Sequence, residues 1–165
     1  MKKTAIVLGS DSDLSIAEKS IAVLERLGLP FDVSIISAHR TPERAREFSL
    51  NACANNYGVI IAIAGTSAAL SGVLAAHTRL PVIGVPVKSD DLGGLDALLS
   101  TVQMPPGVPV ACVAIDGGAN AAWLAARILA VEDDELSARL EAEAQDMARK
   151  VEGKNDAIRA KYNQH

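Results

Sequence analysis

The sequence predicts an α/β protein, a three-layer α/β/α sandwich around a parallel sheet of about five strands in flavodoxin-like order. Short β-branched runs alternate with longer helical patterns along residues 4–131. Most of these runs are apolar throughout rather than alternating, which is typical of parallel strands covered on both faces. Aromatic residues make up only 3% of the chain although hydrophobic residues make up 49%. Aliphatic side chains must therefore build the core.

Five runs are expected to form the strands: Thr4–Leu8, Asp32–Ile36, Val59–Ala64, Val82–Val85 and Val110–Ala114. Helices are expected at about Leu14–Leu27, Pro42–Asn56, Ser67–Thr78, Leu92–Ser100 and Ala119–Val131. The first helix should end at Gly28, because glycine favours the position after a helix. The second helix has a favourable start, with Thr41 as a hydroxyl N-cap and Pro42 at the first helical position.

A last amphipathic segment runs from Asp133 to about Lys161, and no strand follows it. We expect one domain over residues 1–165, with a core at 4–131 and a helical extension at 132–165. The trailing helix has nothing left to cover within its own domain. It should therefore pack against another subunit of a homo-oligomer.

Composition and charge exclude several classes of protein. A net charge of −4 without a block of like charges argues against nucleic-acid binding. No segment approaches the roughly 18 consecutive apolar residues of a membrane span, and the N-terminal apolar run is too short for a signal peptide. Cys53 and Cys112 lack metal-ligand spacing, so we expect no metal site and a reducing, cytoplasmic setting.

Ligands of such sheets bind beyond the carboxyl ends of the strands, where four loops are candidates. The first is Gly9–Asp13, whose hydroxyls and free amides suit an anion. Asp13 suits the hydroxyls of a sugar. The alternative is a simple helix cap, for which Ser10 and Asp13 are ordinary choices.

The second loop, residues 37–41, carries Ser37, His39 and Arg40. A histidine at the end of a strand, just before a helix N-terminus, can accept and return a proton near neutral pH. Arg40 offers a fixed fork to a phosphate or carboxylate. The alternative is a surface histidine in a local hydrogen bond, but the neighbouring arginine favours function.

The remaining candidates are weaker. Gly65, Thr66 and Ser67 open a loop of small residues, which allows either a ligand or a neighbouring backbone to come close. Residues 84–89, followed by 93–96, form either a rim or a plain connection. Three further side chains are interpreted as structural or terminal: His77, Trp123 and His165.

The stretches "GSDSD", "SAHRTPER", "LPVIGVPV" and "STVQMPPGVPVACVAI" followed by "NAAWLAARILA" resemble the 5-(carboxyamino)imidazole ribonucleotide mutase family, related to aminoimidazole ribonucleotide carboxylase. The resemblance covers about residues 4–131. It implies de novo purine biosynthesis, with decarboxylation of 5-(carboxyamino)imidazole ribonucleotide and recarboxylation at C4. It also implies a flavodoxin-like octamer with shared sites, a C-terminal helix that embraces a neighbour, and no cofactor.

The resemblance also implies roles for single residues. His39 corresponds to the family's catalytic histidine, which shuttles a proton. Ser10, Asp13 and Arg40 correspond to residues that hold the phosphate and ribose, and Ser37 lies beside them.

Further along the chain, Gly65 and the small residues after it, Thr66 and Ser67 among them, correspond to the loop around the imidazole and its carboxylate. The residues Gln103, Met104 and Pro105 correspond to a stretch of the active-site and subunit walls.

One position departs from the mutase pattern. Mutases usually carry a second histidine in a Gly-Ala-Ala-His-Leu-Pro-Gly-like segment, and Ala69 stands in its place here. "ALSG" is closer to the branch that carboxylates aminoimidazole ribonucleotide with free CO2. The mutase is the main hypothesis, this carboxylase is an alternative, and a nucleotide-binding regulatory protein without catalysis is another.

Overall fold

The chain folds around one parallel sheet in the computed structural model, which describes residues 1–163. The strand order is β2-β1-β3-β4-β5, and every neighbouring pair is parallel. The strands are β1 (Lys3–Leu8), β2 (Phe31–Ile35), β3 (Tyr57–Gly65), β4 (Val82–Val87) and β5 (Ala111–Cys112). The flavodoxin-like order predicted from the sequence is confirmed.

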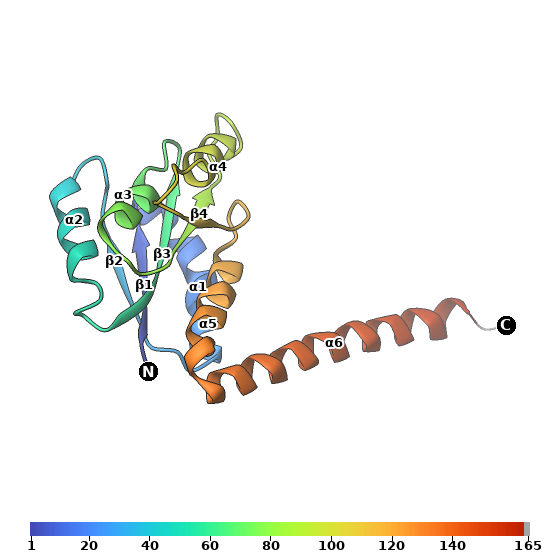
Figure 1. The fold of residues 1–165 in the computed structure, drawn as a ribbon. Helices are drawn as coiled ribbons and strands as arrows, with labels where there is room; N and C mark the ends of the chain where they lie inside the picture. The colour runs from blue at the N-terminus through green and yellow to red at the C-terminus, as the bar shows by residue number, and fades with distance from the viewer. Residues whose placement is uncertain (164–165) are drawn as a thin grey trace.

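Helices cover both faces of the sheet, which confirms the three layers (Figure 1). One face carries α1 (Leu14–Arg26) and α5 (Gly118–Leu129). The other carries α2 (Pro42–Asn51), α3 (Leu70–His77) and α4 (Leu95–Val102). Two 3-10 turns, η1 (Asp11–Asp13) and η2 (Ala130–Glu132), precede α1 and the last helix, α6 (Asp134–Tyr162).

The central strands are buried on both faces because successive side chains alternate between two cores. From β1 and β3, Ile6 and Ile61 face the layer of α1 and α5, whereas Val7 and Ile60 face the layer of α2 and α3. All four are fully buried. The continuous apolar runs in the sequence therefore reflect burial on both sides.

Helices α1 and α5 approach closely through small residues. The Ser20 hydroxyl donates a hydrogen bond to the Gly118 carbonyl at 2.7 Å. A Cβ atom at Gly118 would collide with the carbonyl oxygen of Ile16 in α1. Glycine at position 118 thus sets the distance between the two helices.

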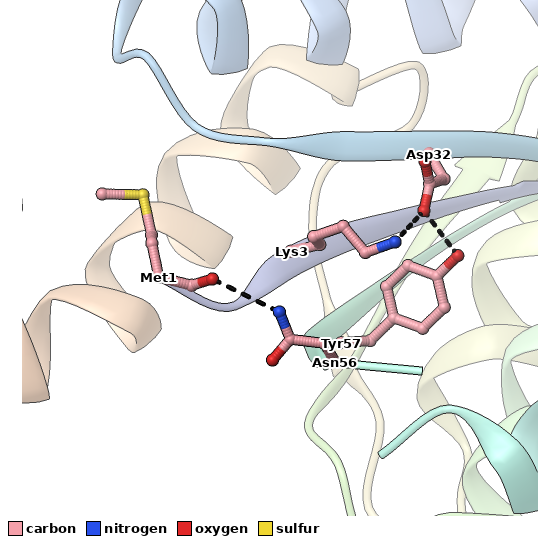
Figure 2. A network of polar contacts seen from close by, with 5 residues as sticks. All are labelled: Met1, Lys3, Asp32, Asn56 and Tyr57. Atoms are coloured by element: carbon pink, nitrogen blue, oxygen red, sulfur yellow. Dashed lines mark hydrogen bonds and ion pairs between the residues drawn. The ribbon is translucent and has the colours of Figure 1, made fainter. Parts of the chain in front are cut away.

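Three strands are linked at the amino end of the sheet by one carboxylate (Figure 2). Asp32 in β2 accepts hydrogen bonds from Lys3 Nζ at 2.6 Å and from Tyr57 Oη at 2.8 Å. These two bonds lower the pKa of the Asp32 carboxyl. Burial, together with the bond to this carboxylate, raises the pKa of Tyr57 to about 12. The network lies at the sheet edge where the strands begin.

Several boundaries differ from the sequence-based expectation. Helix α2 ends at Asn51 rather than Asn56, because the chain turns and Asn56 adopts a φ of 65°. Strand β5 spans only two residues rather than Val110–Ala114. It ends early because the chain turns soon after it: the Gly117 amide donates to the Ala114 carbonyl at 2.9 Å, and Asp116 adopts a φ of 57°.

The C-terminal helix α6 extends away from the sheet (Figure 1). Its first turn is fixed by Asp133, whose side chain accepts a hydrogen bond from the Leu136 amide at 2.9 Å. Leu136 is buried, but apolar side chains further along are exposed: Met147, Val151, Ile158 and Tyr162. Within residues 1–163, no helix is long and apolar enough to cross a membrane.

The same substitution at two glycines should have opposite effects on stability. Gly118→Ala should lower the free energy of unfolding by about 1–3 kcal/mol, because the new methyl group overpacks the contact with α1. Gly153→Ala in α6 should raise it by about 0.5–1 kcal/mol, because alanine favours the helix and, within residues 1–163, the new methyl group would meet no atom closer than 4 Å beyond its chain neighbours and the adjacent helix backbone. Urea unfolding of the three proteins measures both. A stable Gly118→Ala variant would show that α1 and α5 can move apart freely.

Candidate functional site

A cavity of about 420 Å³ lies beyond the carboxyl ends of β1, β2, β3 and β4. It is formed by the loops that follow these four strands. Its lining contains all eight residues for which a catalytic or substrate-binding role is expected from the sequence: Ser10, Asp13, Ser37, His39, Arg40, Gly65, Thr66 and Ser67. The fold therefore brings together residues that are up to 57 positions apart in the chain.

The loop after β1 is held by a capping box. Asp13 Oδ2 accepts a hydrogen bond from the Ser10 amide at 3.1 Å, and Ser10 Oγ accepts one from the Ser12 amide at 3.3 Å. The Gly9 amide donates to the Ile63 carbonyl at 2.8 Å, which fixes the loop against β3. Ser10 and Asp13 therefore act as helix caps, as the alternative interpretation of the sequence predicted. Both residues also line the cavity.

Asp13 is a buried carboxyl, with 5% of its surface exposed. Burial raises its pKa, and the hydrogen bonds from Ser10 and Ser12 only partly oppose this effect. A charged form that is poorly hydrated binds hydroxyl donors well, because they replace the missing water. The position suits the hydroxyl groups of a sugar.

The loop after β2 closes on itself and leaves two side chains pointing outward. Thr41 Oγ1 donates to the Ser37 carbonyl at 2.9 Å and accepts from the Ser37 amide at 3.1 Å. Ser37 Oγ accepts from the Arg40 amide at 3.2 Å. The side chains of His39 and Arg40 are exposed and line the cavity. Neither side chain has a hydrogen-bond or ion-pair partner among residues 1–163.

Thr41 does not have the capping role expected from the sequence. Its side chain makes no cap hydrogen bond to α2, although Pro42 does occupy the start of the helix. The hydroxyl is instead engaged by the backbone of Ser37. The first amides of α2 are consequently left without a side-chain cap, two to four residues after Arg40 in the chain.

The loop after β3 is longer than expected, because α3 begins at Leu70 rather than at Ser67. Thr66 adopts a φ of 51°, and the Ala69 amide donates to the Ser67 carbonyl at 2.7 Å in a tight turn. The side chains of this loop are small, which leaves room for a planar group above the end of β3.

The loop after β4 also lines the cavity through Val87, Lys88 and Ser89. From the sequence, residues 84–89 are expected to form either a rim or a plain connection, and no site residue is expected among them. Lys88 supplies a second permanent cation besides Arg40. In the sequence, the position of Lys88 directly after an apolar strand was the one pattern that could have indicated a site residue.

Other candidates lie away from this cavity. His77 Nδ1 lies 2.9 Å from the Val73 carbonyl oxygen, one helical turn earlier. Trp123 packs against the core of α1 and α5, with Arg26 5.0 Å from its ring centre. Both fit the structural interpretation. His165 lies outside the described residues. No group of three or more potential metal ligands occurs within residues 1–163.

The stretch Gln103, Met104 and Pro105 follows α4 and does not line the cavity of its own chain. The Met104 side chain packs near Gly72 at the start of α3, where a Cβ atom would lie 3.3 Å away. The wall role that the resemblance implies for these residues therefore stays a prediction that involves a second chain.

Comparison with known proteins gives one consistent family. A family model described as AIR carboxylase matches residues 3–150. N5-carboxyaminoimidazole ribonucleotide mutase of Pyrococcus horikoshii is 54% identical over 149 residues, which cover 90% of this chain and 84% of that protein. The mutase of Methanocaldococcus jannaschii is 48% identical over 157 residues, which cover 95% and 98% of the two chains.

Two further matches extend the comparison. Phosphoribosylaminoimidazole carboxylase of Saccharomyces cerevisiae is 51% identical over 136 residues, which are 82% of this chain but only 24% of that protein. The crystal structure of Treponema denticola PurE superimposes with a TM-score of 0.86 at 32% identity, covering 94% of this chain and 97% of that one.

The buried carboxyl of Asp13 should make stability depend on pH. In the unfolded chain this carboxyl ionises near its usual value of 3.8, whereas in the folded chain it ionises at higher pH. Stability contributed by the protonated form is therefore lost as pH rises through that interval. Asp13→Asn should become the more stable protein as pH rises from 3 to 7, because the amide can still accept the Ser10 bond.

Urea unfolding across this pH range measures the difference. The exposed Asp91→Asn serves as the matched control and should show no growing difference from the wild type. A constant difference between wild type and Asp13→Asn at all pH values would mean that burial does not disfavour the Asp13 charge.

Proposed function

The chain belongs to the AIR carboxylase family, and we infer that it is an N5-carboxyaminoimidazole ribonucleotide mutase of de novo purine biosynthesis. As such it is an isomerase that acts on a ribonucleotide. It moves the carboxyl group of the substrate from the exocyclic nitrogen to carbon 4 of the imidazole ring. The observation that carries this function at the level of the site is an unpartnered His39 beside Arg40 at the mouth of a polar cavity.

The phosphate and ribose have suitable partners on the β1 and β2 side of the cavity. Arg40 presents a bidentate donor, and the uncapped amides at the start of α2 lie close to it in the chain. Ser10 and Ser37 add hydroxyl groups, while the Asp13 carboxylate accepts hydrogen bonds from the ribose hydroxyls. This arrangement supports placing the nucleotide's sugar phosphate there.

The imidazole ring fits the β3 side of the cavity, above Gly65, Thr66 and Ser67. A Cβ atom at Gly65 would lie 3.5 Å from Val87 Cβ, so a side chain here would fill the space between two strand ends. Small side chains leave this space for the ring. We assign the substrate-binding roles of these three residues on that basis.

In this proposal His39 carries out both proton transfers of the reaction. The carbamate C–N bond breaks, its electrons return to the nitrogen, and the nitrogen gains one proton as CO2 forms. Carbon 4 then attacks CO2, and the new C–C bond is followed by loss of the C4 proton. One imidazole that gives a proton to the nitrogen and takes one from C4 ends the cycle unchanged.

The cavity makes the second step efficient. Holding CO2 against the ring converts a dilute bimolecular carboxylation into a local reaction, a gain that reaches several orders of magnitude for well-positioned partners. The proton transfer and the ring's own nitrogen lone pair supply the chemistry without a cofactor in this proposal.

We also propose that the protein is a homo-oligomer, an octamer by resemblance, that acts in the cytoplasm. Helix α6 carries exposed apolar side chains far from the body of its own chain, and Leu95, Leu99 and Val102 of α4 are exposed as well. A second chain would cover such surfaces. The free thiols of Cys53 and Cys112 fit a reducing compartment.

His39→Asn should abolish turnover while ligand binding is retained. Asparagine keeps the size and polarity of the position but cannot exchange a proton, so kcat should fall by about 100-fold or more. The assay follows conversion of the carbamate nucleotide to the C4-carboxylate without ATP or added metal, and calorimetry follows binding. His77→Asn, which lies outside the cavity, is the matched control and should keep full activity.

The same assay decides between the alternatives. A mutase consumes the carbamate nucleotide directly, whereas a carboxylase would use aminoimidazole ribonucleotide at a rate that rises with dissolved CO2. A regulatory protein would be stabilised by nucleotide without turning over either substrate. Unchanged turnover of His39→Asn would remove this histidine from the mechanism.

One added charge on α6 should weaken the proposed assembly of several chains. Val151→Glu places a carboxylate on the exposed apolar side of the helix, where Val151 is 63% exposed in the single chain. If this side is buried between chains, the mass in solution should fall towards that of a smaller assembly. Gln145→Glu is the matched control on a polar position of the same helix. Equal masses for both variants and the wild type would exclude Val151 from the interface.

A further inference from the structure

The substrate of the proposed reaction carries two separate anionic groups, a phosphate and a carboxylate. The charged residues that line the cavity are Asp13, Arg40 and Lys88, with His39 as a further titratable group. Two cationic side chains therefore line one cavity. The proposed function assigns a role to Arg40 but none to Lys88.

The strand order separates these two cations. Arg40 follows β2 and Lys88 follows β4, with β1 and β3 between them. Three strand intervals separate the strands β2 and β4 by about 14 Å. Because Arg40 lies with the α2 amides on the phosphate side, Lys88 lies on the side of the ring and of the small loop after β3.

The register of the strands brings Lys88 close to the ring position. Gly65 pairs with Val87 across β3 and β4, so Lys88 is the next residue beyond the partner of Gly65. The wall on this side otherwise consists of small or apolar side chains, including Ala68, Ala69 and Leu70. Lys88 carries the permanent positive charge on this side of the cavity lining.

The backbone of Lys88 is fixed by contacts from distant parts of the chain. Its amide donates to Asp116 Oδ1 at 2.9 Å, and the Asp116 amide donates to the Pro86 carbonyl at 2.9 Å. Gly94 packs so closely that a Cβ atom there would lie 3.0 Å from Lys88 Cα. Asp116 itself adopts a φ of 57°, an uncommon conformation for a residue other than glycine.

The next residue fixes the loop as well. Ser89 is buried, and its hydroxyl donates to Asp96 Oδ1 at 2.9 Å while it accepts from the Gly94 amide at 3.4 Å. The Lys88 side chain, in contrast, is exposed, and its ammonium has no hydrogen-bond or ion-pair partner within residues 1–163. A rigid backbone therefore presents a free cation at the cavity.

We propose that Lys88 binds the migrating carboxylate of the substrate and so determines specificity for the carboxylated nucleotide. This inference rests on the proposed function. An ammonium near this carboxylate stabilises the starting carbamate and the final C4-carboxylate alike, since both are anions. It stabilises the uncharged CO2 between them less. Lys88 consequently contributes to binding and orientation more than to the rate of the chemical step.

Variants of Lys88 test this role by comparing two ligands. Lys88→Met and Lys88→Gln should bind the C4-carboxylated nucleotide about tenfold to a hundredfold more weakly, as expected for loss of a charge-assisted hydrogen bond. Their affinity for aminoimidazole ribonucleotide, which has no carboxylate, should change less than about threefold. KM for the carbamate substrate should rise and kcat should not fall, because the anionic carboxylate loses more stabilisation than the uncharged CO2 stage.

Matched variants show whether the positive charge of Lys88 is the cause of the difference in affinity. Lys88→Arg should retain most of the affinity, because it keeps the charge. Lys19→Met, on the exposed face of α1, should match the wild type for both ligands. Arg40→Met should weaken both ligands equally, because both carry the phosphate. Since the Lys88 side chain has no hydrogen-bond or ion-pair partner in the part of the chain that the structure describes, its variants should melt at the temperature of the wild type.

Two results would overturn the inference. Unchanged affinity of Lys88→Met and Lys88→Gln for the carboxylated nucleotide would show that Lys88 does not contact it. Equal losses for both ligands would assign Lys88 to the phosphate instead. Neither result contradicts the proposed function. That function is contradicted only if the wild type does not convert the carbamate nucleotide.

Discussion

The parallel alignment of β1 to β4 is the constraint on which the site depends. In a parallel sheet the carboxyl ends of all strands meet at one edge, so the four loops that follow them leave the sheet side by side. Leu8 of β1 pairs with Ile35 on one side and with Ile63 on the other, and Gly65 pairs with Val87. These pairings place the loop residues at one level. A shift of register in any strand would displace one wall of the cavity.

The loops use local hydrogen bonds to free their functional groups. Ser10 and Asp13 bond each other's backbones, Thr41 bonds the backbone of Ser37, and Ser89 bonds Asp96. These bonds satisfy amides and hydroxyls that would otherwise compete for the side chains facing the cavity. As a result, one histidine and two cationic side chains line a polar cavity and have no hydrogen-bond or ion-pair partner within residues 1–163. Such groups are available to a ligand without first breaking a contact.

The opposite end of the sheet has a different character. There Asp32 joins Lys3 and Tyr57, so charged groups are paired with one another. Pairing of this kind stabilises the arrangement of three strands, although the individual surface ion pair contributes little. The two ends of the sheet therefore have different roles. At the amino end side chains link the strands, and at the carboxyl end the side chains that line the cavity stay available to a ligand.

The sequence by itself determined the class of fold and the strand order, because apolar runs and helix starts are local signals. It also named eight of the residues that line the cavity, in part through the resemblance to a known family. It also identified the family, which the comparisons confirmed. Only the tertiary structure decided the role of Thr41, the shortness of β5 and the place of Lys88 in the cavity. The physical reason is the range of the contacts involved. Lys88 is held by Asp116, 28 residues away, and by the pairing of β3 with β4, and neither contact leaves a local pattern in the chain.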